Sequence, residues 1–167
     1  MENIMKHQYD LVRSVRQHLF GFMEETPLEK LHEGVPGFGI GRMIEAHIHA
    51  ADCYRFWIGS FAFQQKPSEF ADTPERVIAN ADVRKVREIF DSVDETVEKF
   101  LDRYNSRWLE EIENVVEEGD KPVRLTPLFL LSHAETHEFH HKGQIVSMAR
   151  HLGYNPPADE RLGALFA

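Results

Sequence analysis

The sequence has 167 residues, with 19 basic and 28 acidic side chains and a formal net charge of −9 at pH 7. This length suits one domain with a sizeable core, and we expect a single domain over residues 1–167. The negative charge argues against nucleic acid or an anionic membrane as the main partner. The sequence has no apolar run of about 18 residues and no signal-peptide pattern at its N-terminus, so it predicts a cytoplasmic protein.

A single cysteine, Cys53, is present. One cysteine excludes an intrachain disulfide and fits a reducing compartment. We interpret Cys53 as a small buried or half-buried side chain, because no neighbouring feature of the sequence activates its thiol.

The N-terminal third of the chain begins with a predicted helix. From about residue 4 to Glu25 apolar side chains recur at helical spacing, and the pair Thr26-Pro27 ends the run. Residues 27–39 contain two prolines and three glycines, which predicts a loop.

A second helix is predicted from Ile40 to Phe63. Projected at about 100° per residue, its apolar stripe is centred on His47. By the same projection His49 lies about 160° away, on the side of Asp52 and Phe56. We therefore expect His47 to face the core and His49 to face outward.

The sequence pattern in the middle of the chain predicts a crossover, a third helix and a hairpin. Gln64–Ala81 is irregular and reads as a long crossover, with room for a short helix after Thr73-Pro74. The third helix is expected to begin after Asp82 as its N-cap and to run to Tyr104. Its apolar residues form a heptad stripe that contains no candidate metal ligand. Val115-Val116 and residues 123–125 flank Gly119-Asp120 and predict a small hairpin.

The last helix is predicted from Thr126 to Gly153. His137 and His141 lie at the centre of its core stripe, and residues four apart project in parallel from adjacent turns. Two such imidazoles can bind one metal ion. His133, His140 and His151 lie about 60° to one side and are expected to flank the core stripe.

Four amphipathic helices joined by long connections predict an all-α four-helix bundle, a fold that builds metal sites from facing helices. The only inward-facing histidine of the second helix is His47, and with His137 and His141 it makes a candidate set of three neutral ligands. Three ligands leave coordination positions open, as in catalytic sites. Gln144, one turn beyond His141 on the same stripe, either orients a substrate or the water or thiol bound to the ion, or is a polar core residue satisfied by a backbone group.

These residues resemble the DinB family of metal-binding bundles. The resemblance rests on His47 followed by Asp52 on the second helix, and on the pattern H-x3-H-x-G-Q from His137 to Gln144. It implies a dimeric bundle with long interhelical joins and one Zn²⁺ or Ni²⁺ ion per chain. Relatives of this kind include transferases and isomerases that use a low-molecular-weight thiol such as bacillithiol or mycothiol.

Three functions remain open at this point. The first is a metal-dependent S-transferase, in which the ion binds the cosubstrate thiol and a small-molecule electrophile accepts it. The second is a metal-dependent hydrolase that activates water. The third is a non-catalytic metal-binding or stress-response protein, in which the ion holds the helices together. No residue outside the ligand set receives a catalytic role.

A homodimer is expected from apolar side chains outside the core stripes. Phe56 on the second helix, and Phe139 and Val146 on the last, project away from each core face. Two aligned sets on the ligand-bearing helices suggest one surface that a two-fold axis buries twice. The tail residues Leu162, Leu165 and Phe166 are expected to pack on the body.

Overall fold

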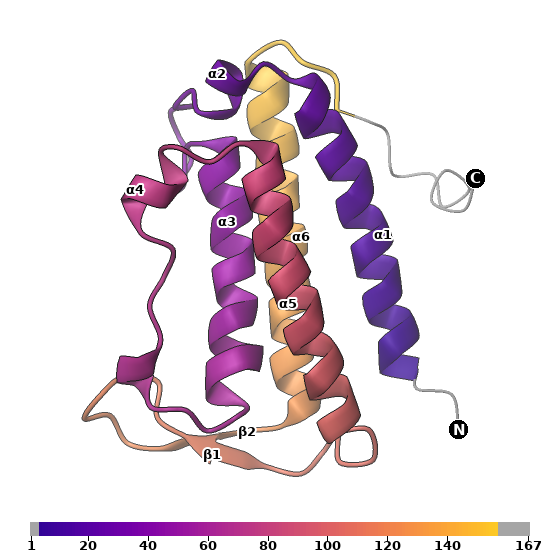
Figure 1. The fold of residues 1–167 in the computed structure, drawn as a ribbon, viewed down its shortest axis with the longest axis vertical. Coiled ribbons are helices and arrows are strands. Elements are labelled where there is room, and N and C mark those ends of the chain that lie inside the picture. Colours follow the sequence, from indigo (N-terminus) through magenta and orange to yellow (C-terminus); the bar gives the residue numbers. More distant parts are fainter. Residues whose placement is uncertain (1–3, 157–167) are drawn as a thin grey trace.

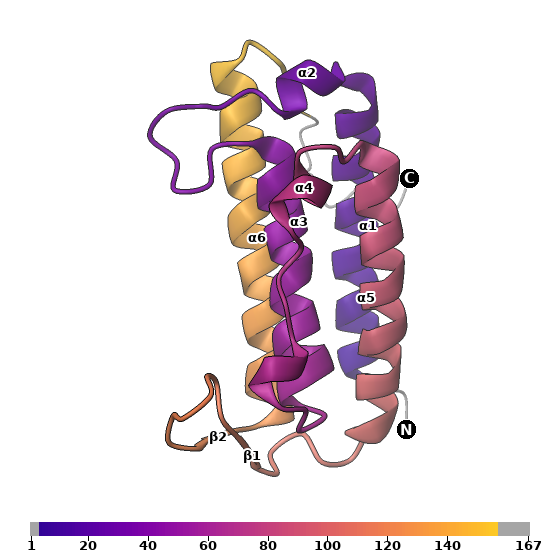
Figure 2. The same ribbon diagram turned by 60° about the vertical axis from the view of Figure 1, so that its left-hand side comes forward.

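The computed structural model describes residues 4–156, in which four long helices lie side by side (Figures 1 and 2). They are α1 (Ile4–Glu25), α3 (Met43–Tyr54), α5 (Val83–Arg103) and α6 (Pro127–His151). A π-helical segment, η1 (Arg55–Phe61), continues α3 without a break. The fold is mostly helical, as predicted. No helix among the described residues is both long and apolar enough to cross a membrane.

Short elements connect the long helices. They are α2 (Leu28–Leu31), the 3₁₀ turn η2 (Pro67–Glu69), α4 (Glu75–Ile78), and the strands β1 (Ile112–Asn114) and β2 (Val123–Leu125). The strands pair antiparallel with Ile112 opposite Leu125, so the predicted hairpin exists but its first strand lies earlier than expected. Figure 1 shows the segment with η2 and α4 running along the outside of α3. The expected packing of Leu162, Leu165 and Phe166 lies outside the described residues.

Helices α5 and α6 begin at the N-caps that the sequence predicts, whereas α3 begins at Met43, three residues after the predicted start at Ile40. The Thr126 hydroxyl accepts a hydrogen bond from the Phe129 amide at 3.2 Å, and the Asp82 carboxylate accepts one from the Lys85 amide at 2.7 Å. Each bond satisfies an amide that the first helical turn leaves free. Gly153, just after α6, has φ of +85°, a conformation that ends helices and suits glycine.

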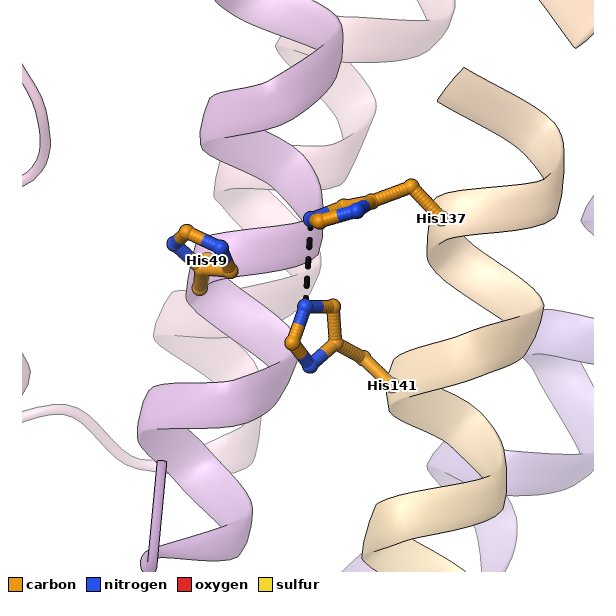
Figure 3. Close-up of side chains that lie close together, drawn as sticks. All are labelled: His49, His137 and His141. Atoms are coloured by element: carbon orange, nitrogen blue, oxygen red, sulfur yellow. Dashed lines mark hydrogen bonds between the residues drawn. The ribbon is translucent and has the colours of Figure 1, made fainter. Parts of the chain in front are cut away.

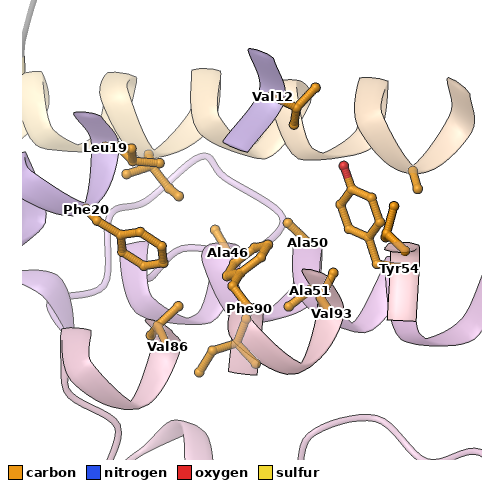
Figure 4. Close-up of a cluster of buried hydrophobic side chains, with 14 of the residues drawn as sticks. Val12, Leu19, Phe20, Ala46, Ala50, Ala51, Tyr54, Val86, Phe90 and Val93 are labelled. Atoms are coloured by element: carbon orange, nitrogen blue, oxygen red, sulfur yellow. The ribbon is translucent and has the colours of Figure 1, made fainter. Parts of the chain in front are cut away.

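Helix α3 lies in the middle of the structure, with α6 on one side and α5 on another. Its residues are buried all round except for Glu45 and His49. Figure 4 shows Ala46 and Ala50 of α3 beside Phe20 and Phe90, which belong to α1 and α5. Small side chains let these helices approach closely. The core therefore surrounds α3 and is not confined to one stripe.

A buried charge network joins all four long helices. Arg16, only 2% exposed, lies 2.7 Å from Glu138 and 2.7 Å from Asp94. The Tyr54 hydroxyl donates to Glu138 at 2.8 Å, and the Tyr9 hydroxyl donates to Asp94 at 2.6 Å. A buried charge is stable only when it is paired and hydrogen-bonded. This network thus fixes α1, α3, α5 and α6 relative to one another.

Candidate metal centre

Three imidazoles meet between α3 and α6 (Figure 3). His49 comes from α3, and His137 and His141 come from successive turns of α6. One ligand nitrogen of each lies within 4.8 Å of the other two. His49 is exposed, His137 half-buried and His141 buried, so the group has an inner end in the protein and an outer end in solvent.

The spacing of the three nitrogens suits a single metal ion. The Nε2 atoms of His137 and His141 are 3.1 Å apart. Two imidazole nitrogens bound to one ion at 2.0–2.1 Å lie about 3.3 Å apart in a tetrahedral site and about 3.0 Å apart in an octahedral one. The observed distance lies between these values. The His49 ring centroid is 5.2 Å from that of His137 and 4.8 Å from that of His141, within reach of the same position.

Gln144 fixes which nitrogen of His141 is protonated. The Gln144 Oε1 atom, 2.9 Å from Nδ1 of His141, can only accept a hydrogen bond. The proton of His141 is therefore on Nδ1, and Nε2 presents its lone pair to the group. The amide nitrogen of Gln144 donates to Nε2 of His140 at 3.1 Å. Gln144 thus orients the His141 ring, a role different from the contact with a bound ligand or substrate that we expected from the sequence.

Two of the three imidazoles, those of His137 and His141, are neutral at physiological pH. The pKa of His137 is lowered to about 4, mainly by burial and next by His141 and His49. Burial, followed by the nearby His49, likewise lowers the pKa of His141 to about 4. Only neutral imidazole binds a metal, so both ligands are available at pH 7 without an energetic cost of deprotonation.

A cavity of about 550 Å³ opens beside the imidazoles. His49 and His137 form part of its lining, and Phe56, Trp57 and Phe70 provide an aromatic wall. Phe56 and Trp57 pack edge to face with ring centroids 4.8 Å apart, and Phe70 from the crossover packs on Phe56 with centroids 5.1 Å apart. Pockets that bind small molecules commonly have this size and aromatic character.

Residues 1–166 match the sequence model of the DinB family. The chain belongs to the DinB family. This confirms the resemblance carried by His137, His141, Gly143 and Gln144. No curated protein matches the chain in sequence.

In this DinB chain, the α3 histidine that lies beside His137 and His141 is His49 and not the predicted His47. His47 is buried as expected, but it packs between Phe20 and Phe90, with ring centroids 4.8 Å from each. Among the described residues it belongs to no group of candidate metal ligands. Burial, followed by the charges of Arg16 and Arg87, lowers its pKa to about 3. Because α3 is surrounded, its strongest apolar stripe faces α1 and α5, and His49 is the histidine that meets α6.

A second group of donors includes the single cysteine. One ligand atom each of Cys53, His133 and His137 lies within 4.8 Å of the other two. Cys53 is buried, as predicted, and burial raises the pKa of its thiol to about 12. A periodic signal was present in the sequence: His49 and Cys53 are four residues apart, as are His133 and His137. Matching these two series would have favoured His49 over His47.

Among the described residues, the other two flanking histidines, His140 and His151, belong to neither group. His140 bonds to Gln144, and Nδ1 of His151 donates to the Ser147 carbonyl at 2.8 Å. Arg42, just before α3, is paired with Glu45 and Glu75, both at 2.9 Å.

Proposed function

We propose that this DinB chain is a four-helix bundle in which His49, His137 and His141 bind one divalent ion, Zn²⁺ or Ni²⁺. The ion would serve a transferase that joins a low-molecular-weight thiol to an electrophilic small molecule. The proposal is supported most directly by three imidazoles whose nitrogens lie close enough to meet at one ion, two of which, His49 and His137, line a cavity of about 550 Å³. A metal bound only to three histidines keeps positions for an exogenous ligand.

When bound, such an ion would lower the pKa of a thiol or water molecule that binds beside the imidazoles. The chain provides the rest. Gln144 holds His141 in the tautomer that binds metals, and Trp57 and Phe56 offer an apolar wall against which an electrophile can lie.

The charge of the cavity narrows the choice of thiol. Its lining includes Asp72, Glu117 and Glu118, which are exposed, and it includes no lysine or arginine. The only other lining carboxylate, Asp52, is neutralised by Arg55 at 2.5 Å and by two bonds from Thr73. Negative side chains repel an anionic ligand. We therefore expect an uncharged or cationic thiol to be preferred over one with several carboxylates.

An assay of thiol consumption tests this function. Protein loaded with Zn²⁺ or Ni²⁺ is mixed with a panel of neutral and anionic thiols and an aromatic electrophile such as a chlorodinitrobenzene. We expect metal-dependent consumption of a neutral thiol that His141→Ala abolishes. The matched control is His151→Ala on the same helix, which should keep full activity.

Two outcomes point to the other functions. Hydrolysis of ester or amide probes without any thiol would support the hydrolase instead. If the metal raises the melting temperature and no substrate is turned over, the ion only stabilises the packing of α3 on α6.

A further inference from the structure

Two pairs of side chains, one on α3 and one on α6, face each other between the two helices. On α3, Cys53 lies one turn after His49, and on the antiparallel α6, His133 lies one turn before His137. Side chains four residues apart lie one above the other on a helix. The second group of donors, Cys53 with His133 and His137, therefore repeats the first group one helical turn away, with sulfur in place of one imidazole.

We propose that Cys53, His133 and His137 form a second cation site, selective for thiophilic d¹⁰ ions such as Cd²⁺ or Cu⁺. Three atoms that are all within 4.8 Å of one another have a common point within about 2.8 Å of each. Metal–sulfur and metal–imidazole bonds of about 2.3 and 2.0 Å then require only small side-chain rotations. Binding replaces the S–H bond of Cys53 by a sulfur–metal bond and releases the proton to water.

The donor atoms decide which ions the second site prefers. Thiolate sulfur is a soft ligand that selects Cu⁺, Cd²⁺ and related ions, whereas a site of three imidazoles also accepts Ni²⁺. The two neighbouring groups therefore differ in preference although they share His137. This inference does not depend on the thiol transfer proposed above.

Aromatic neighbours hold His133 in place for this role. The Trp57 ring meets His133 edge to face, with centroids 5.5 Å apart and an interplanar angle of 83°. Phe129 lies parallel to the imidazole, at an angle of 3° and a centroid distance of 6.3 Å. Rigid support of this kind lowers the entropic cost of forming a site.

The second site is also accessible. Cys53, His133 and His137 all line the cavity of about 550 Å³, although Cys53 is only 9% exposed. An ion can reach the sulfur through the cavity without opening the helices. The exposed carboxylates Glu117 and Glu118 at the same cavity favour the approach of a cation.

A cadmium titration of the metal-free protein tests the second site. Ultraviolet charge transfer from thiolate to Cd²⁺ reports sulfur coordination directly, and Cys53 is the only possible source. We expect a band that saturates at one equivalent in the wild type, is absent in Cys53→Ser, and needs at least about tenfold more Cd²⁺ in His133→Ala. His140→Ala, on the same helix but outside both groups, should titrate as the wild type.

His49→Ala separates this site from the first one. It should lose Co²⁺ absorption from the three-imidazole group and keep the cadmium–thiolate band. Circular dichroism checks that every variant is folded. The inference is overturned if the wild type shows no band, or if His133→Ala binds Cd²⁺ as the wild type does. Loss of the band in His49→Ala would also overturn it, because Cys53 would then be a further ligand of the first ion.

Discussion

At the scale of single residues, one hydrogen bond sets the chemistry that His141 offers. Gln144 accepts from Nδ1 at 2.9 Å, which leaves Nε2 unprotonated and 3.1 Å from Nε2 of His137. Partners that hold a ligand histidine in one tautomer typically contribute 10–100-fold to metal affinity. The carbonyl oxygen of Gln144 is thus as much part of the proposed site as the ligands themselves.

Gln144→Ala should therefore weaken metal binding by about 10–100-fold, measured by competition with a chromophoric chelator. Gln144→Glu should bind nearly as the wild type, because its carboxylate also accepts from Nδ1. His140→Ala removes the other partner of Gln144 and should change affinity little. Equal affinity in Gln144→Ala and wild type would contradict this role.

His47 is expected to make stability depend on pH. Neither ring nitrogen of His47 has a hydrogen-bond partner, and burial lowers its folded-state pKa to about 3. In the unfolded chain the pKa is about 6.5, so below pH 6.5 the unfolded state takes up a proton that the folded state does not. The free energy of unfolding should fall as the pH is lowered from about 6 to about 4.

We predict that His47→Leu removes this dependence. As the pH is lowered from about 6 to about 4, the free energy of unfolding of the variant minus that of the wild type should increase by about 1.4 kcal/mol for each pH unit. Urea unfolding of both metal-free proteins measures the difference, in which the other titrating groups cancel. A difference that does not change with pH would mean that His47 is hydrated in the folded protein.

At the scale of elements, the position of α1 depends on a buried cation. Arg16 contacts Glu138 of α6 and Asp94 of α5, and its side chain is 1% exposed. Arg16→Leu leaves the buried Glu138 without a cationic partner and Asp94 with Arg13 alone, 3.0 Å away, and should lower the free energy of unfolding by about 3–5 kcal/mol. Chemical denaturation with circular dichroism detects this loss.

The matched control is the surface pair of Arg84 and Glu88, 2.9 Å apart, in which the Arg84 side chain is 79% exposed. Arg84→Leu should change the free energy of unfolding by less than about 1 kcal/mol. Adding Glu138→Gln to Arg16→Leu should restore part of the loss, because it removes one unpaired charge. If Arg16→Leu costs no more than Arg84→Leu, the network does not hold α1.

The elements also show how far the sequence determines the site. The cap residues and the period of apolar residues predicted the long helices, and the spacing of His137 and His141 predicted that they face one another. Whether His47 or His49 belongs to the proposed metal site depends on which helix packs against each side of α3. That is a matter of tertiary packing, and a projection that assumes one core face cannot decide it for a surrounded helix.

Two further residues needed the folded chain. Arg16 reads as an ordinary charged residue in an amphipathic helix, and its partners are 78 and 122 residues away. Phe56 was expected on the outside, but Phe70 of the crossover covers it, with centroids 5.1 Å apart. Contacts so distant in sequence leave no local pattern to interpret.

At the scale of the whole molecule, we still predict a homodimer, now through α6 and α1. Phe139 remains 43% exposed, and Leu11 on α1 is 39% exposed. Burying apolar side chains twice across a two-fold axis would stabilise association. Light scattering should give twice the chain mass, and Phe139→Glu should shift it towards the monomer with unchanged metal content. Leu109→Glu, which alters an exposed apolar residue between α5 and β1, should leave the mass unchanged.

The metal content of two α3 variants tests the proposed centre most directly. Wild type, His49→Ala and His47→Ala are loaded with Ni²⁺, which the thiolate-containing second site does not prefer, passed through a desalting column and measured by elemental analysis. We predict about one ion per chain in the wild type and in His47→Ala, and almost none in His49→Ala, because only His49 lies with His137 and His141. Metal retained by His49→Ala and lost from folded His47→Ala would contradict the site described here.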